Sequence, residues 1–301
     1  MPNGIDLSSH SDYSDPLAHS ALLDKVPTDL AGLSAVARNV IVHYRASGRE
    51  LPESTRDDIH RRWLSSILDA DQERHGSPLA EPREETARVQ GCCRDHSLFC
   101  VGVLRQHGIA ARSRIGFAGY FEPPYFHDHV VVETRQDGGR WVRFDPEVAE
   151  PLNDLATPQD MPTGPDSPFL TAAEVWLGYR AGKLDPNNFG VAPGSEFGGP
   201  WFIRNYVVLE VAHRHGDELL LWDGWGAGAA PGAEADPDEL ALLDEIATLL
   251  VASDSGDSAA EAELARRYAE DARLHPGSQV ERFSPYGEPP IVEEIGPRKF
   301  S

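Results

Sequence analysis

Apolar residues recur at helical spacing in the N-terminal part of the chain. Residues 17–47 and 57–73 both carry this pattern, for example through Leu64, Ile67 and Leu68, and the polar stretch SGRELPEST separates them. An apolar residue every three to four positions places a stripe of side chains on one face of a helix. The sequence therefore predicts helices in this part.

The pattern changes from helix to strand in the middle of the chain. From Asp95 to His107 the run DHSLFCVGVLRQH sets apolar residues on one helical face, and Gly108 follows as a helix terminator. Three strand-like segments come next, namely SRIGFAGYF, HVVVETR and RWVRF, with QDGG as a turn between the last two. We therefore expect an α+β fold in which this helix packs on an antiparallel sheet.

Helical spacing returns in the last third. Thr171 and Glu174 in TAAE have the spacing of a capping box, and residues 201–215 form a second amphipathic segment before Gly216. Two further helices are predicted at LALLDEIATLLVA and AAEAELARRYAEDARL, and the Pro- and Gly-rich tail from His275 is expected to be mobile.

These patterns divide the chain into four consecutive parts. We expect a helical N-terminal part over residues 1–85, a core over 86–150, a helical extension over 151–225 that packs on the core, and an acidic C-terminal tail over 226–301 with helical and flexible segments.

The last two strands of the core predict their own register. If partner numbers sum to 274, the turn is Gln136 to Gly138 and His129 lies directly opposite Asp145. A one-residue slip would mix polar and apolar residues on both faces, so the alternation favours this pairing. The apolar pairs are then Val130 with Phe144 and Val132 with Val142. An imidazole and a carboxylate are thus predicted to be neighbours.

Two adjacent cysteines precede the predicted core helix, in the stretch GCCRDHS at residues 91–97. A thiol at a helix N-terminus lies near the positive end of the helix dipole, which favours the thiolate. With a histidine on one strand and an acid on the next, the sequence supplies a nucleophile, a base and a group that orients the base. This set predicts acyl-transfer chemistry.

The same residues resemble a known family. GCCRDHSLFCVGVLRQHGIAAR, HVVVE and WVRFDPE resemble, in this order, the conserved blocks of the transglutaminase-like superfamily, over about residues 86–147. The resemblance implies a papain-like fold and makes residues 86–150 the catalytic core. It also implies a Cys-His-Asp triad, with Cys93 as nucleophile, His129 as base and Asp145 as its orienter.

Three more residues are expected beside the triad or against the substrate. Cys92 occupies the variable position of the motif, and Asp95 is expected to cap the Cys93 helix. Trp141 shares the face of His129 in the predicted register, so we expect it to pack over the acyl intermediate. His96 and His127 are expected to be solvated or to lie next to the site, and Cys100 to be a core residue.

Two other classes of function are compatible with the residues. Cys92, Cys93 and Cys100 with His96 or His127 would offer zinc ligands, although adjacent cysteines lack the spacing of structural zinc sites. A non-catalytic ligand-binding module on the same fold is the other alternative. An intact triad favours a cysteine hydrolase, a peptidase or amidase, or an amide-forming acyltransferase that acts through a thioester.

Composition limits the partners. The 301 residues carry 27 basic and 49 acidic side chains, a net charge of -22, which disfavours binding to nucleic acid or to an anionic membrane. The sequence predicts a cytoplasmic protein that needs no cofactor and no metal. We expect its substrate to be a small-molecule or peptide amide, with water or an amine as the acceptor.

Overall fold

The computed structural model describes residues 6–136, 139–164, 166–228, 232–234 and 236–296. The chain divides into two compact units. The first unit comprises Asp6–Arg114 and His129–Pro168. The second unit comprises Ile115–Asp128 and the described part of the chain from Phe169 on. The boundaries after Arg114 and after Asp128 fall within two long strands.

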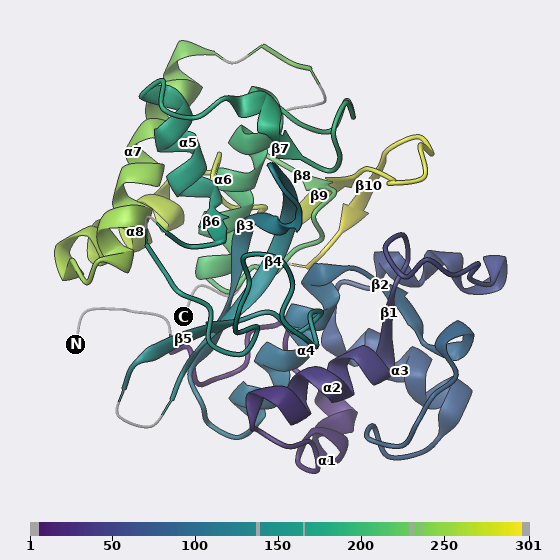
Figure 1. Cartoon of the computed structure of the whole chain (residues 1–301). Helices are drawn as coiled ribbons and strands as arrows, with labels where there is room; N and C mark the ends of the chain where they lie inside the picture. The colour runs from purple at the N-terminus through teal and green to yellow at the C-terminus, as the bar shows by residue number, and fades with distance from the viewer. Residues whose placement is uncertain (1–5, 137–138, 165, 229–231, 235, 297–301) are drawn as a thin grey trace. The chain divides into compact units, whose positions relative to one another are not determined.

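Helices account for most of the first unit before residue 107 (Figure 1). The α-helices are α1 (Ser20–Leu23), α2 (Leu30–Val40), α3 (Leu64–His75) and α4 (Cys93–Gln106), and the 3-10 helices are η1 (Leu17–His19), η2 (Glu53–His60) and η3 (Glu85–Ala87). Helices α2 and α3 both pack against α4, which is buried along almost its whole length. Helices are therefore present in both predicted segments, but residues 41–43, at the end of the first segment, form a strand.

A short parallel pair of strands lies beside α4. Strand β1 (Ile41–His43) follows α2 directly, and β2 (Val89–Gly91) leads into α4. Their register pairs His43 with Gly91, and the backbone N–H of Tyr44 donates to the Gly91 carbonyl over 2.9 Å. This pairing brings a histidine from early in the chain to the start of α4.

The main sheet has the strand order β5-β4-β3-β6, with β7 pairing to β4. Its strands are β3 (Ala111–Glu122), β4 (Tyr125–Arg135), β5 (Trp141–Phe144), β6 (Phe169–Thr171) and β7 (Phe189–Gly190). Strand β4 is antiparallel to β5, and β3 is antiparallel to β6. Helices around an antiparallel sheet confirm the predicted α+β class.

The predicted register of the β4–β5 hairpin is wrong by two residues. Val132, not Val130, pairs with Phe144, and Glu133 pairs with Arg143, so the partner numbers sum to 276. Because side chains alternate with period two, a shift of two residues leaves each side chain on its predicted face, and apolar patterning cannot detect it. Residues 137 and 138 of the predicted turn lie outside the described residues.

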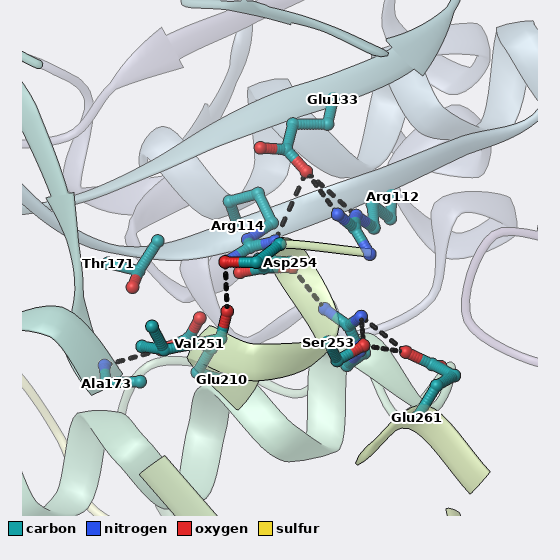
Figure 2. A network of polar contacts seen from close by, with 12 residues as sticks. Arg112, Arg114, Glu133, Thr171, Ala173, Glu210, Val251, Ser253, Asp254 and Glu261 are labelled. Atoms are coloured by element: carbon teal, nitrogen blue, oxygen red, sulfur yellow. Dashed lines mark hydrogen bonds and ion pairs between the residues drawn. The ribbon is translucent and has the colours of Figure 1, made fainter. Parts of the chain in front are cut away.

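Charge selects the observed register. The buried Glu133 carboxylate receives Arg143 from β5 at 2.9 Å, and Arg112 and Arg114 from β3 at 2.7 and 3.2 Å. Figure 2 shows Arg112 and Arg114 directed toward Glu133. A buried carboxylate needs charged partners, and this register provides them directly opposite and on the neighbouring strand.

The second unit contains four α-helices, and α5, α6 and α7 contact one another while α8 packs on α7. They are α5 (Ala172–Arg180), α6 (Pro200–Arg214), α7 (Pro237–Asp254) and α8 (Ser258–Glu270), with a 3-10 turn η4 (Pro186–Asn188). The predicted capping box is present, since Glu174 accepts from the Thr171 N–H and Thr171 accepts from the Glu174 N–H. Helix α6 packs on β3 through Phe117 and Tyr206, whose ring centroids are 5.2 Å apart.

Further polar contacts hold the helices of this unit. Glu210 on α6 accepts from the Ala173 N–H at the start of α5, over 2.8 Å. Arg214 at the end of α6 binds Asp254 and Glu261 at 2.7 and 2.6 Å, joining α6 to the end of α7 and to α8. The Ala173, Asp254 and Glu261 ends of these contacts are labelled in Figure 2.

The last part of the chain contains strands that the sequence patterns did not predict. A three-stranded sheet has the order β10-β9-β8, formed by β8 (Asp223–Gly224), β9 (Gln279–Arg282) and β10 (Ile291–Glu294). Of the four β9 residues, Val280 is buried while Gln279 and Glu281 are exposed, so the apolar signal is too weak to indicate a strand.

Within the described residues, no helix combines the length and the apolar character that crossing a bilayer requires.

Candidate active site

The N-terminus of α4 is built around Cys92 and Cys93. Cys92 is the N-cap with extended backbone, and Cys93 is the first helical residue. Asp95 accepts from the Cys92 N–H over 2.8 Å and from the Arg94 guanidinium over 2.9 Å. Asp95 therefore caps the helix, as the sequence predicted.

Gly91 leaves room for this cap. A Cβ atom at Gly91 would lie 2.8 Å from Oδ2 of Asp95 and 3.0 Å from Cγ2 of Ile41, too close for either neighbour. The absence of a side chain at Gly91 thus leaves room for the Asp95 carboxylate at its capping position. Cys93 itself is only 4% exposed.

His129 and Asp145 form a buried hydrogen-bonded pair. The Nε2 atom of His129 lies 2.8 Å from Oδ2 of Asp145, and the two side chains are 3% and 0% exposed. Continuing the observed register sets Asp145 opposite Val131, so His129 is its diagonal neighbour on the same face. The other oxygen of Asp145 accepts from the Glu147 N–H over 2.9 Å, which fixes the carboxylate.

One buried contact joins the cysteine helix to the histidine strand. Ser97 lies one turn after Cys93 on α4, and its hydroxyl donates to the Val130 carbonyl over 2.9 Å. Val130 is the residue after His129 in β4. The contact therefore sets the distance between the element that carries Cys93 and the element that carries His129.

A second carboxylate, which the sequence patterns did not single out, lies on the other side of His129. Oε2 of Glu147 is 3.8 Å from Nδ1 of His129, and Oε1 of Glu147 is 2.9 Å from Nδ1 of His96. Nε2 of His96 lies 3.3 Å from the Ile41 carbonyl. His96 is buried next to this carboxylate, so the expectation that it is solvated is wrong, whereas its expected place beside the site is correct.

The charges of these groups depend on one another. Burial by itself would raise the pKa of Glu147, but nearby His96, through its charge and its hydrogen bond, holds that pKa well below its usual range. Burial opposes the charged form of His96, and the Glu147 carboxylate outweighs this and raises the pKa of His96 above its ordinary value. We infer an ion pair between His96 and Glu147 near neutral pH.

His43 is the second histidine near Glu147, and unlike His96 it is uncharged. Burial, the largest effect, lowers its pKa. Its Nδ1 atom accepts from the N–H groups of Arg45 and Ala46 at 3.1 and 2.9 Å, which requires an unprotonated nitrogen there. His43 is thus the neutral member of a histidine cluster that surrounds Glu147.

The other two cysteines differ from Cys93 in their surroundings. Burial raises the pKa of the fully buried Cys100, as fits a core thiol. A hydrogen bond with Cys93 lowers the pKa of Cys92, but burial and the charge of Asp95 oppose it, and the net result is a raised pKa. In the described part of the chain, no three His, Cys, Asp or Glu residues form a group that could hold a metal ion.

Trp141 and His127, which were considered from the sequence, have other contacts. Trp141 lies four residues before Asp145, about 13 Å along an extended strand, with the guanidinium of Arg112 at 4.7 Å from its ring centroid. His127 and Asp128 belong to the second unit. There His127 contacts the Val191 carbonyl at 3.0 Å, and Asp128 accepts from the Tyr206 hydroxyl at 2.6 Å.

Comparison with known proteins finds a match to part of the chain. Residues 43–146 match the transglutaminase-like superfamily. The comparison with curated proteins finds no match. Among solved structures, the chain is similar to a crystal structure of a candidate cysteine protease from Cytophaga hutchinsonii, with 19% identity and a TM-score of 0.32. That similarity covers 51% of this chain and 46% of the other, so this chain spans less than half of its neighbour.

Proposed function

We propose, from the premise that residues 43–146 form a transglutaminase-like superfamily domain, that the protein is a cysteine-dependent enzyme. Its reaction is acyl transfer from an amide, either to water as in an amidase or peptidase, or to an amine. The catalytic residues are Cys93, His129 and Asp145. The observation that carries the proposal is the buried 2.8 Å bond between His129 and Asp145, on the strand that Ser97 ties to the Cys93 helix.

The first half of the reaction forms a thioester. The Cys93 thiolate attacks the amide carbonyl carbon, and the imidazolium of His129 protonates the leaving nitrogen as the C–N bond breaks. Asp145 accepts a hydrogen bond from Nε2 of His129 and stabilises the imidazolium. The position of Cys93 as the first residue of α4 supports this step, because the helix dipole favours the thiolate there.

The second half releases the acyl group. Neutral His129 takes a proton from water or from an amine as this acceptor attacks the thioester carbonyl, and Cys93 leaves as the thiolate. Backbone N–H groups at the start of α4 are the proposed donors to the oxyanion. The choice of acceptor depends on how far water is excluded from the thioester.

Alkylation with iodoacetamide near neutral pH tests the nucleophile. We expect Cys93 to be labelled before Cys92 and Cys100, and the rate to fall when His129 is replaced by alanine. Cys93→Ala should abolish the fast labelling, and Cys92→Ala is the matched control that should retain it. Equal labelling of all three thiols, or thiols protected by stoichiometric zinc until it is chelated, would overturn the proposal.

A screen of small amides with and without added amines tests the reaction itself. Release of ammonia or amine without an acceptor identifies a hydrolase, and a new amide product identifies a transferase. Both activities are expected to disappear in Cys93→Ala. An activity that survives this replacement would contradict the proposed mechanism.

A further inference from the structure

An aromatic cavity of about 250 Å³ lies within the second unit. Its walls come from α6, from the segment around β8, and from the loop between β9 and β10. Six of its aromatic residues are Trp201, Phe202, Tyr206, Trp222, Trp225 and Phe283. The residues that line the cavity all lie outside residues 43–146.

The polar atoms of several rings are bonded to the protein. Nε1 of Trp201 donates to the Glu196 carbonyl at 3.3 Å, and Nε1 of Trp225 donates to the Leu274 carbonyl at 3.1 Å. The Tyr206 hydroxyl donates to Asp128 at 2.6 Å. What these residues offer a ligand is therefore mainly the hydrocarbon surface and the negative faces of their rings.

The rings are held in place by one another. Trp201 meets Phe202 edge to face with centroids 5.5 Å apart, and Phe202 stacks on Tyr206 with centroids 4.5 Å apart. These three residues lie on one side of α6 and form a continuous wall. A wall fixed by ring contacts is preformed, which lowers the cost of ordering the site when a ligand binds.

The charged residues at the cavity are acidic. Among the described residues that line it, Asp223 and Glu288 carry charge and none is Lys, Arg or His. Asp223 is buried and Glu288 is exposed on the loop after β9. Carboxylates and aromatic faces both attract a cation, and both disfavour an anion.

The size of the cavity limits the ligand. An apolar cavity of about 150 Å³ holds a benzene molecule, so 250 Å³ admits a ring of that size with a short side chain. We propose that the cavity binds a small organic cation in which an ammonium group is carried on such an apolar body. The rings bury the apolar part, and the carboxylates and ring faces stabilise the charge.

Titration calorimetry of the full chain with three matched probes tests the proposal. 2-Phenylethylamine, 2-phenylethanol and phenylacetate share a phenyl ring and differ in charge. We expect the amine to bind about tenfold more tightly than the alcohol, the ratio that 1.4 kcal/mol of cation–π and ionic attraction gives. Phenylacetate should bind more weakly than both. Equal affinity for amine and alcohol, or no amine binding at millimolar concentration, would overturn the proposal.

Variants locate the binding. Trp222→Leu keeps apolar bulk but removes a ring, and should weaken the amine more than the alcohol. Glu288→Gln changes an exposed side chain and should weaken only the amine, whereas Glu281→Gln, an exposed residue of the same hairpin outside the cavity lining, should have no effect. Binding must persist in Cys93→Ala. Loss of amine binding in that variant would assign the amine to the cysteine site and refute this one.

Discussion

Glu147 lies 3.8 Å from Nδ1 of His129, the ring nitrogen that Asp145 does not bind. In the proposed mechanism this nitrogen exchanges the proton with Cys93 and the leaving group. The His129 imidazolium would therefore have a carboxylate near each nitrogen. Because Glu147 is itself held by His96 at 2.9 Å, its position does not depend on the charge of His129.

Replacement of Glu147 by glutamine should remove the pH-dependent contribution that the Glu147–His96 pair makes to the free energy of unfolding. The low pKa of Glu147 gives a stabilisation that is present above its ordinary value of 4.5 and is lost as the pH falls through the lower folded value. The raised pKa of His96 gives a second stabilisation. This contribution is present below the ordinary pKa of 6.5 and is lost as the pH rises through the higher pKa of His96 in the folded protein. The stabilisation from both shifts is therefore complete between these two ordinary values.

We expect Glu147→Gln to lower the free energy of unfolding by about 2 kcal/mol within this window, as a buried hydrogen bond between charged groups contributes. The loss should shrink above the pKa of His96. Urea unfolding at a series of pH values measures it, and Glu150→Gln, an exposed neighbour, is the matched control. A loss that stays constant through neutral and alkaline pH would rule out the ion pair.

Replacement of Asp145 by asparagine should slow the alkylation of Cys93. The 2.8 Å bond to His129 stabilises the imidazolium, which in turn favours the thiolate. We expect the second-order rate with iodoacetamide to fall about tenfold at neutral pH, which corresponds to roughly 1.4 kcal/mol less stabilisation of the charged pair. Asp154→Asn, on the exposed loop that follows, should react like the wild type. An unchanged rate in Asp145→Asn would remove Asp145 from the mechanism.

Removal of the Ser97 hydroxyl tests how α4 is attached to β4. Ser97→Ala deletes the bond to the Val130 carbonyl in a buried site, at an expected cost of about 1–2 kcal/mol in the free energy of unfolding. The alkylation rate of Cys93 should fall as well, since the helix and the strand lose a link near the site. Ser34→Ala is the control, because that hydroxyl bonds the Leu30 carbonyl of its own helix. Equal effects of the two variants on the rate would argue against a positioning role for Ser97.

The sequence was most informative where a residue acts within its own segment. The caps formed by Asp95 and Thr171 follow from local spacing, and the structure has both. Alternation in β4 and β5 assigned His129 and Asp145 to one face, and they are bonded there. The same alternation could not choose between registers two residues apart. Trp141 shares the face of His129 and Asp145 but lies too far along its strand to reach them.

Contacts between distant segments could not be predicted. His43 reaches the site through the parallel pairing of β1 with β2, a fold-level arrangement that no local pattern indicates. Glu147 follows Asp145 closely, but its importance depends on its contact with His96, which lies on another segment of the chain. The division of the chain into four consecutive parts remains a prediction. The catalytic roles of the triad are also predictions, and the experiments above address them.

The arginines around Glu133 give the last prediction, which concerns the register of the hairpin. Glu133→Gln leaves three buried or nearly buried guanidinium groups, those of Arg112, Arg114 and Arg143, around a neutral side chain. Breaking a buried ion pair by removing one partner costs about 3–5 kcal/mol, because the remaining charge is not compensated. We expect a loss of this size in chemical unfolding.

Asp160→Asn is the control. It removes a carboxylate that also binds an arginine, Arg140, but at an exposed site. Its effect on the free energy of unfolding should be small because water screens the pair. If the two variants lose the same free energy, the buried cluster does not stabilise the observed register, and packing of the apolar face would have to account for it.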